Sequence, residues 1–202
     1  MTAKIKLNAA SGGGSFSLQA PSSSSNNRVF TLPDLADATL LTSNATLGKF
    51  ASYAVIADQK ANNGTSGNFV SGDWRTRDLN TELADADGIV SISSNQFTLQ
   101  AGTYLIKWSC PAYGRDYHAS RLRNVTDGSS VGGSGASTYA DYNSNVQNTS
   151  IGSTRITISG AKAFEIQHRC SQSTSHSNGF GVDTNFDVDY EIFTIVEIYK
   201  EI

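Results

Sequence analysis

Charged residues are scarce in this chain. They make up 16% of its 202 residues, and the formal net charge is −3 at pH 7, whereas about 25% of an ordinary soluble domain is charged. A disordered chain usually needs a high net charge, and a helical bundle usually has a surface rich in Glu and Lys. The composition therefore argues against both. It also leaves no basic patch to follow a phosphate backbone, so nucleic acid is not expected as a partner.

Long apolar runs and cysteines are also scarce. No run approaches the roughly 18 apolar residues that span a membrane, so we expect no membrane insertion. The first ten residues lack the apolar stretch of a secretory signal, which predicts synthesis in a cytoplasm. Cys110 and Cys170 are too few for a disulfide framework, and their default state is reduced. Whether these two cysteines pair stays open at this stage.

Small polar residues and glycine fill the chain instead. It holds 28 serines, 18 threonines, 15 asparagines and 18 glycines, a composition typical of a β protein with many turns. Short segments in which apolar and polar residues alternate predict roughly eight to ten strands. These segments are residues 53–59, 88–93, 97–100, 103–110, 119–124, 155–159, 163–170 and 189–202. Their short spacing leaves no room for helical crossovers, and we expect residues 76–87 to form a loop. The predicted fold class is all-β.

Residues 1–48 differ from residues 49–202, and we predict that they form a separate N-terminal segment. They contain the run Gly12–Gly14, two of the three prolines and only very short apolar alternations. The alternations are Ile5/Leu7, Phe16/Leu18/Ala20 and Phe30/Leu32. One interpretation is a flexible Gly/Ser linker. The other is an ordered β stalk. Each apolar alternation is too short to bury its own face, and copies of the segment from other subunits would cover it.

The last predicted strand is apolar on both faces. Strict alternation places Tyr190, Ile192, Thr194, Val196 and Ile198 on one face, and Phe193, Ile195 and Tyr199 on the other. In a two-layer sandwich one face of a strand covers the core, so the other face needs a second cover, and another subunit is the simplest one. The sequence therefore predicts an oligomer. The predicted interface residues are Tyr104, Trp108, Phe193, Ile195 and Tyr199.

The segments FTLQAGTYLIKW and SRLRNVTDG, at residues 97–108 and 120–128, resemble the central strands of a trimeric jelly-roll superfamily. That superfamily includes tumour necrosis factor and the globular head of the first complement component. The matching positions are Gly102, Tyr104, Leu122, Asn124, Gly128 and the aliphatic run Ile192–Ile198. The Ser/Gly/Asn-rich loop at 129–148 departs from the family pattern. The resemblance implies an antiparallel two-sheet jelly-roll head that forms a homotrimer.

The stretch IKLNAASGGGSFSLQAPSSSSNNRVFTLPDL, residues 5–35, resembles a short segment that precedes the heads of many phage tail-fibre proteins. This resemblance implies a virion protein, on the tail or the capsid surface, in which residues 1–48 contact other virion proteins. Its head would bind a host cell-surface receptor, either a glycan or an outer-membrane component. One alternative is a capsid decoration or head-knob protein with a purely structural role. A weaker alternative is a lectin-like or glycan-cleaving domain.

No sequence motif supports an enzyme. The chain contains no G-x-S-x-G elbow, no H-E-x-x-H and no Walker or dinucleotide fingerprint. Asp85 and Asp87 form a carboxylate pair of the kind used in glycan cleavage, but nothing else in the sequence accompanies them. We therefore predict a protein without catalytic residues and without an organic cofactor.

Two loop segments carry the predicted ligand-binding residues. They combine tyrosine with Asp, Asn and Ser, as adaptable recognition loops do, because tyrosine provides a large contact area at low entropic cost. Tyrosine rings and neighbouring amides also suit sugar rings. The candidates are Tyr113, Arg115, Asp116, Tyr117, His118, Tyr139, Asp141, Tyr142 and Asn143. The alternative is that these aromatic side chains pack on the rim of the head or at a subunit interface.

Oxygen-bearing side chains alternate just before the last strand and suggest a Ca²⁺ site, because this cation prefers oxygen ligands. The candidate ligands are Asp183, Asn185, Asp187 and Asp189. The alternative is an exposed acidic loop. The three histidines show no metal-ligand spacing. His168 and Cys170 share a predicted strand face with Phe164 and Ile166, so we expect both in the core.

Overall fold

A computed structural model describes residues 4–8, 11–19, 49–144, 146–173, 176–184 and 186–202. The chain divides into two compact units, Met1–Asn44 and Ala45–Ile202. In the first unit β1 (Lys4–Asn8) and β2 (Ser15–Gln19) form an antiparallel hairpin in which Leu7 lies opposite Phe16. The Phe30/Leu32 alternation lies outside the described residues. None of the described segments forms a helix with the length and apolar character that crossing a membrane requires.

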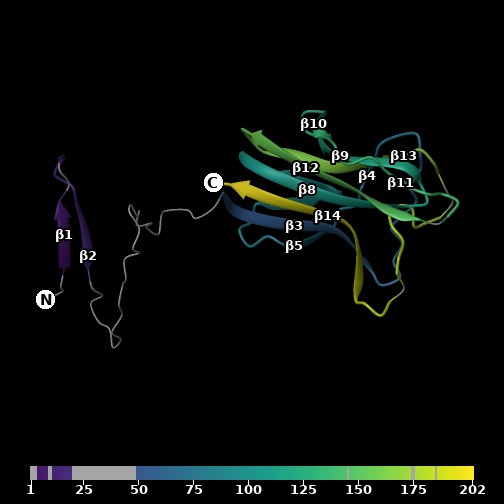
Figure 1. Cartoon of the computed structure of the whole chain (residues 1–202), viewed down its shortest axis with the longest axis horizontal. Helices are drawn as coiled ribbons and strands as arrows, with labels where there is room; N and C mark the ends of the chain where they lie inside the picture. Colours follow the sequence, from purple (N-terminus) through teal and green to yellow (C-terminus); the bar gives the residue numbers. More distant parts are fainter. Residues whose placement is uncertain (1–3, 9–10, 20–48, 145, 174–175, 185) are drawn as a thin grey trace, which may run out of the picture. The chain divides into compact units, whose positions relative to one another are not determined.

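The second unit is a sandwich of two antiparallel sheets (Figure 1). The first sheet contains, in spatial order, β12 (Gln147–Ile158), β8 (Gly102–Tyr113), β14 (Tyr190–Glu201), β3 (Phe50–Ala61) and β5 (Thr81–Ala84). The second contains β10 (Ser129–Ser134), β9 (Asp116–Asn124), β13 (Lys162–Cys170), β7 (Gln96–Leu99) and β6 (Val90–Ser93). Beside it, β11 (Thr138–Ala140) pairs with β9 and β4 (Arg75–Thr76) pairs with β13.

Consecutive long strands change sheet each time, from β7 to β8 to β9 and again from β12 to β13 to β14. This alternation between two antiparallel sheets is the connectivity of a jelly roll. The predicted all-β, two-sheet sandwich is confirmed. Two predicted loops are wrong in part, because residues 129–148 contain β10 and β11, and residues 76–87 contain β5. Both segments are too short and too polar for their periodicity to be recognised.

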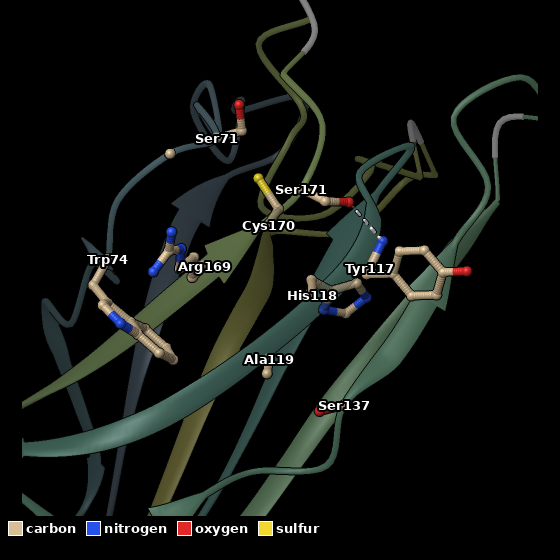
Figure 2. Close-up of a pocket in the computed structure, with 10 residues that line it drawn as sticks. Ser71, Trp74, Tyr117, His118, Ala119, Ser137, Arg169, Cys170 and Ser171 are labelled. Atoms are coloured by element: carbon tan, nitrogen blue, oxygen red, sulfur yellow. Dashed lines mark hydrogen bonds between the residues drawn. The ribbon is translucent and has the colours of Figure 1, made fainter.

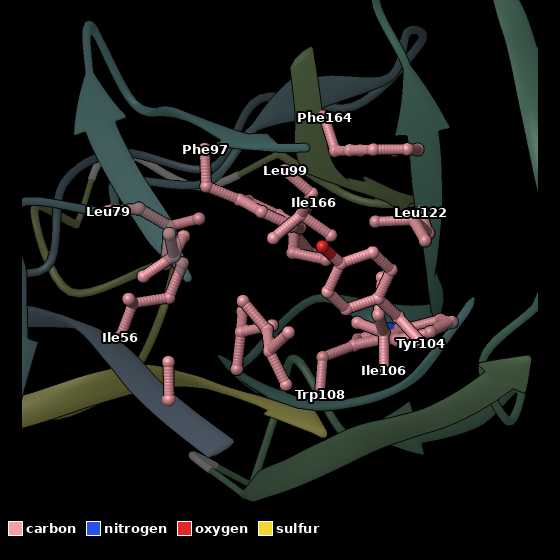
Figure 3. Close-up of a cluster of buried hydrophobic side chains, with 14 of the residues drawn as sticks. Ile56, Leu79, Phe97, Leu99, Tyr104, Ile106, Trp108, Leu122, Phe164 and Ile166 are labelled. Atoms are coloured by element: carbon pink, nitrogen blue, oxygen red, sulfur yellow. The ribbon is translucent and has the colours of Figure 1, made fainter. Parts of the chain in front are cut away.

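The core lies between the sheets, and β8 supplies its centre (Figure 3). Its period-two pattern turns Tyr104, Ile106, Trp108 and Cys110 inward, and all four are buried. They face apolar side chains of the second sheet, among them the stacked rings of Phe97 and Phe164, whose centroids are 5.7 Å apart. Each fully buried side chain of this size contributes roughly 1.5–3 kcal/mol, so this layer is the main stabilising element.

The burial of β8 corrects the predicted subunit interface. Tyr104 and Trp108 cannot reach a neighbouring subunit, because they point into the protomer's own core. Their polar atoms are also occupied there. The Tyr104 hydroxyl donates to the carbonyl of Gln100 at 3.0 Å, and Trp108 Nε1 donates to Ser120 Oγ at 2.8 Å. The strand's outward face carries Leu105, Lys107 and Ser109 instead.

A β-bulge corrects the faces of the last strand. Ile192 lies opposite Gln59 and Ile195 opposite Ala57, so β14 has one residue more than β3 at this point. The extra residue makes Phe193 and Thr194 both buried and leaves Tyr190 and Ile192 exposed. Phe193, which is only 6% exposed, is therefore a core residue of the protomer and not an interface residue. Ile195 and Tyr199 do remain on the outer face.

A glycine in β12 makes room for the indole of Trp108. Gly152 lies directly opposite Trp108, and a Cβ at this position would come within 2.0 Å of the indole. We expect Gly152→Ala to lower the free energy of unfolding by about 1–3 kcal/mol, because overpacking forces the ring or the strand to move. Urea unfolding monitored by tryptophan fluorescence measures the change. Gly160→Ala is the control, since a Cβ there meets no atom within 4 Å. Equal midpoints for the two variants would contradict the prediction.

Candidate ligand-binding site

The two predicted recognition loops come together through the pairing of β9 with β11. Tyr117 lies opposite Tyr139, and their ring centroids are 5.1 Å apart. The Asp116 carboxylate accepts a hydrogen bond from the backbone N–H of Tyr142 at 3.0 Å, which ties the second loop to the start of β9. Exposed tyrosines from both loops thus share one end of the sandwich.

The acidic side chains of these loops order the backbone. The Asp141 carboxylate accepts hydrogen bonds from the Ser144 hydroxyl at 2.6 Å and from the Asn143 N–H at 2.9 Å. These two donors hold the pKa of Asp141 below its usual value. Asp116 has a backbone φ of 53°, which an aspartate tolerates better than most residues do. The groups left to meet a ligand are therefore the tyrosine rings and the exposed side chain of Asn143.

Three of the predicted ligand-binding residues have structural roles instead. Arg115 is fully buried, and its guanidinium donates to the carbonyls of Gly114 and His176 at 3.4 and 3.3 Å. His118 is 3% exposed and packs against His168. Tyr113 is half-buried, and its N–H donates to the Gly179 carbonyl at 3.2 Å. Sequence composition could not separate these residues from their exposed neighbours.

A cavity of about 470 Å³ lies beside Tyr117 (Figure 2). Four segments form it: the approach to β4, the start of β9, the residue before β11 and the end of β13. Its principal lining residues are Ser71, Trp74, Tyr117, His118, Arg169 and Ser171. In Figure 2, Trp74 and Arg169 lie on one side, and Tyr117 and His118 on the other. Ser171 Oγ accepts the Tyr117 N–H at 3.1 Å, which fixes the tyrosine's backbone to the β13 end.

The sequence analysis missed Trp74 and Arg169. Trp74 is placed by the short pairing of β4 with β13, and the Arg121 guanidinium lies 4.0 Å from the centre of its ring. Arg121 is itself held by Gln167 Oε1, at 2.8 and 2.6 Å. Trp74 could have been noticed as a tryptophan within the otherwise polar residues 71–78. Arg169 could have been noticed because the alternation along β13 places its side chain on the outer face.

A pair of neutral histidines lies under the cavity. His118 Nδ1 and His168 Nε2 are 2.9 Å apart, and His168 packs on Phe69 with ring centroids 4.7 Å apart. Burial, with the nearby charge of Arg77, lowers the pKa of His118 to about 4 and that of His168 well below its usual value. Cys110 and Cys170 are both buried and free, and burial raises the pKa of each thiol to about 11. The prediction that His168 and Cys170 lie in the core is confirmed.

The candidate Ca²⁺ ligands do not form a site among the described residues. In that part of the chain no group of three or more His, Cys, Asp and Glu side chains has the geometry to hold a metal ion. Asp183 accepts a hydrogen bond from the Asn178 amide at 2.7 Å, and Asp187 and Asp189 are exposed. Asn185 lies outside the described residues. The alternation by two failed as a signal because this segment is a loop, in which neighbouring side chains do not share a face.

No family model and no curated protein matches the sequence. Among solved structures, the globular domain of the zebrafish complement 1qA protein is similar, with 13% identity over 75% of this chain and 96% of that one and a TM-score of 0.46. Murine APRIL at pH 5.0 is also similar, with 5% identity over 73% and 98% of the two chains and a TM-score of 0.45. The structure of murine APRIL at pH 8.0 is similar with 7% identity, covers 74% of this chain and 98% of its own, and has a TM-score of 0.42. Similarity at this level concerns the jelly-roll sandwich and carries nothing about ligands or partners.

The histidine pair predicts acid sensitivity. In the unfolded chain these side chains take up a proton near pH 6.5, whereas in the folded protein His118 stays neutral down to about pH 4. The unfolded state therefore binds more protons in this window, and stability falls as the pH falls, by up to about 1.4 kcal/mol per pH unit for each histidine. We expect His118→Gln to flatten the fall in the free energy of unfolding between pH 6.5 and 4, measured by urea titration. A slope that is the same in the wild type and in His118→Gln would refute the prediction.

Proposed function

We propose that this protein is a homotrimeric virion appendage whose C-terminal sandwich binds a glycan on the host cell surface. The observation that carries the proposal is the open cavity between Trp74 and Tyr117, with serine hydroxyls around it. A sugar presents apolar C–H groups on the faces of its ring and hydroxyl groups at its edges. Aromatic walls with interspersed hydroxyls match both features. The role is one of binding, without catalysis.

The exposure of Tyr117 supports this assignment. Its side chain is 71% exposed, whereas His118 and Leu122 of the same strand are buried. Tyr139 beside it is 46% exposed. Exposed aromatic side chains that gather on one surface are typical of binding sites, because tyrosine offers contact area with few rotatable bonds to order. The Tyr117 backbone is held on both sides by β11 and Ser171, so the ring is presented by a rigid element.

The outer face of the first sheet supports the homotrimer. Ile151 is 59% exposed, and together with Ile195 it lines a depression of about 240 Å³. Lys107 and Glu197 form an ion pair at its border, with 3.2 Å between Nζ and Oε2. An apolar floor with a charged rim is the usual anatomy of a subunit contact. We assign this face to a second copy of the chain, because its exposed apolar side chains lie on adjacent paired strands, β12, β8 and β14, and form one continuous surface.

The N-terminal unit supports the virion assignment through sequence resemblance alone. Its β1–β2 hairpin is too small to be stable as an isolated two-stranded sheet in water. Pairing with other copies, or with another virion protein, would give the hairpin the cover that it needs. We therefore assign residues 1–48 to attachment and residues 49–202 to recognition.

The glycan-binding role predicts the effect of removing one ring. Tyr117→Ala should weaken binding to a printed glycan array at least about tenfold, because a buried aromatic contact contributes roughly 1.5–3 kcal/mol. Tyr190→Ala is the matched control, since Tyr190 is also an exposed tyrosine, at 49%, but belongs to the other sheet. Equal losses in both variants, or none in either, would argue against the cavity as the binding site.

The trimer predicts a native mass three times the chain mass of 21.5 kDa in light scattering. Ile195→Asp should lower this mass to that of a single chain, because a carboxylate in the apolar depression lacks a partner. Leu83→Asp is the control, since Leu83 is exposed on β5 at the far edge of the same sheet. A wild-type protein that is monomeric at micromolar concentration would refute the assignment.

A further inference from the structure

We propose that the glycan is acidic, and that Arg169 binds its carboxylate or sulfate group. This inference rests on the proposed glycan-binding function and adds the chemical class of the ligand. Arginines on the outer face of the second sheet lie at the border of the cavity, and some of them have hydrogen-bond partners while Arg169 has none among the described residues.

Three arginines gather on this face although the chain as a whole is acidic, with a net charge of −3. Register places them close together, because Arg121 lies opposite Gln167, Arg123 opposite Glu165 and Arg169 opposite Ala119. Desolvation and the charges of Arg123 and Arg169 lower the pKa of Arg121, while the carboxylates of Asp73 and Glu165 act in the opposite sense. These guanidinium groups would attract an anionic ligand more strongly than a neutral one.

Among these arginines, Arg169 is the one placed to meet a ligand in the cavity. The guanidinium of Arg121 is occupied by Gln167 and the ring of Trp74, and Arg123 lies opposite Glu165 and does not line the cavity. Arg169 is exposed and lines the cavity, and it has no hydrogen bond or ion pair among the described residues. A guanidinium whose donors are free is suited to bidentate binding of a carboxylate or sulfate.

The surroundings favour a short acidic saccharide over a polyphosphate chain. Nucleic acids bind through many phosphate contacts along an extended basic surface. Here the arginines are interspersed with Glu165 and Asp73, and the carboxylate of Asp116 lies at the start of β9. A cavity of about 470 Å³ with one available guanidinium and two aromatic walls fits a compact ligand that carries a single charged group on a ring.

The test uses the full-length protein on a glycan array in which each sialylated, uronate-containing or sulfated glycan stands beside its neutral counterpart. We expect acidic glycans to bind at least about tenfold more strongly than their neutral counterparts, and their binding to weaken as ionic strength rises. Arg169→Gln should remove this preference, so that each acidic glycan binds no more strongly than its neutral counterpart. Arg155→Gln is the matched control, because it removes the same charge from β12 in the other sheet, where Arg155 pairs with Glu201 at 2.8 Å.

The outcomes separate this inference from the function on which it rests. If acidic and neutral glycans bind equally, or if Arg169→Gln keeps the preference, the inference is overturned and the glycan-binding function stands. If no glycan on the array binds, the proposed function fails, and the inference fails with it. A preference for acidic glycans that disappears in Arg169→Gln and persists in Arg155→Gln establishes both.

Discussion

The buried guanidinium of Arg77 holds together the end of the sandwich that carries the cavity. Its Nε donates to Thr194 Oγ1 of β14 at 2.7 Å, and its two terminal nitrogens donate to the carbonyls of Pro111 and Phe180 at 3.2 and 2.9 Å. The group also lies 4.4 Å from the centre of the Phe180 ring. A buried charge is costly unless every donor is satisfied, and burial lowers the pKa of Arg77 accordingly. One side chain thus joins the β4–β5 connection, the neighbouring strands β8 and β14 of the first sheet and the loop before β14.

This constraint explains how short polar loops can build a defined cavity. The Arg77 N–H donates to the Ile166 carbonyl at 2.8 Å, which fixes the segment carrying Trp74 against β13. On the opposite side, Trp108 Nε1 bonds Ser120 Oγ, which is 2.8 Å from Ser150 Oγ, so a hydrogen-bonded chain crosses between the sheets. With the strand ends held in these two ways, serine and glycine are sufficient in the loops.

Period-two alternation was enough to predict the sandwich, since each strand covers the core with every second residue. It did not show which face of β8 points inward, and Tyr104 and Trp108 were wrongly predicted at a subunit interface. It failed at β14, because the bulge at Phe193 shifts the pattern by one residue and leaves no trace in hydrophobicity alone. Loop composition could not separate Tyr117 and Tyr139, which are exposed, from Arg115 and His118, which are buried. Their difference arises from contacts with residues 50 or more positions away, such as His168 and His176. Trp74 and Arg169 were missed for the same reason, since the cavity forms where segments distant in the sequence meet.

The two proposed surfaces are compatible because they belong to different sheets. The apolar depression lies on β8, β12 and β14, whereas the cavity lies at the ends of β9 and β13. Subunit contacts on the first sheet therefore leave the cavity open, and a trimer presents three copies of it. Sugar contacts through one guanidinium and two rings are individually weak, and simultaneous engagement of linked sites raises overall affinity by about 10²–10⁴ without any new contact. Each cavity then needs only a modest affinity for its glycan. This is consistent with a cavity that is open and does not enclose its ligand.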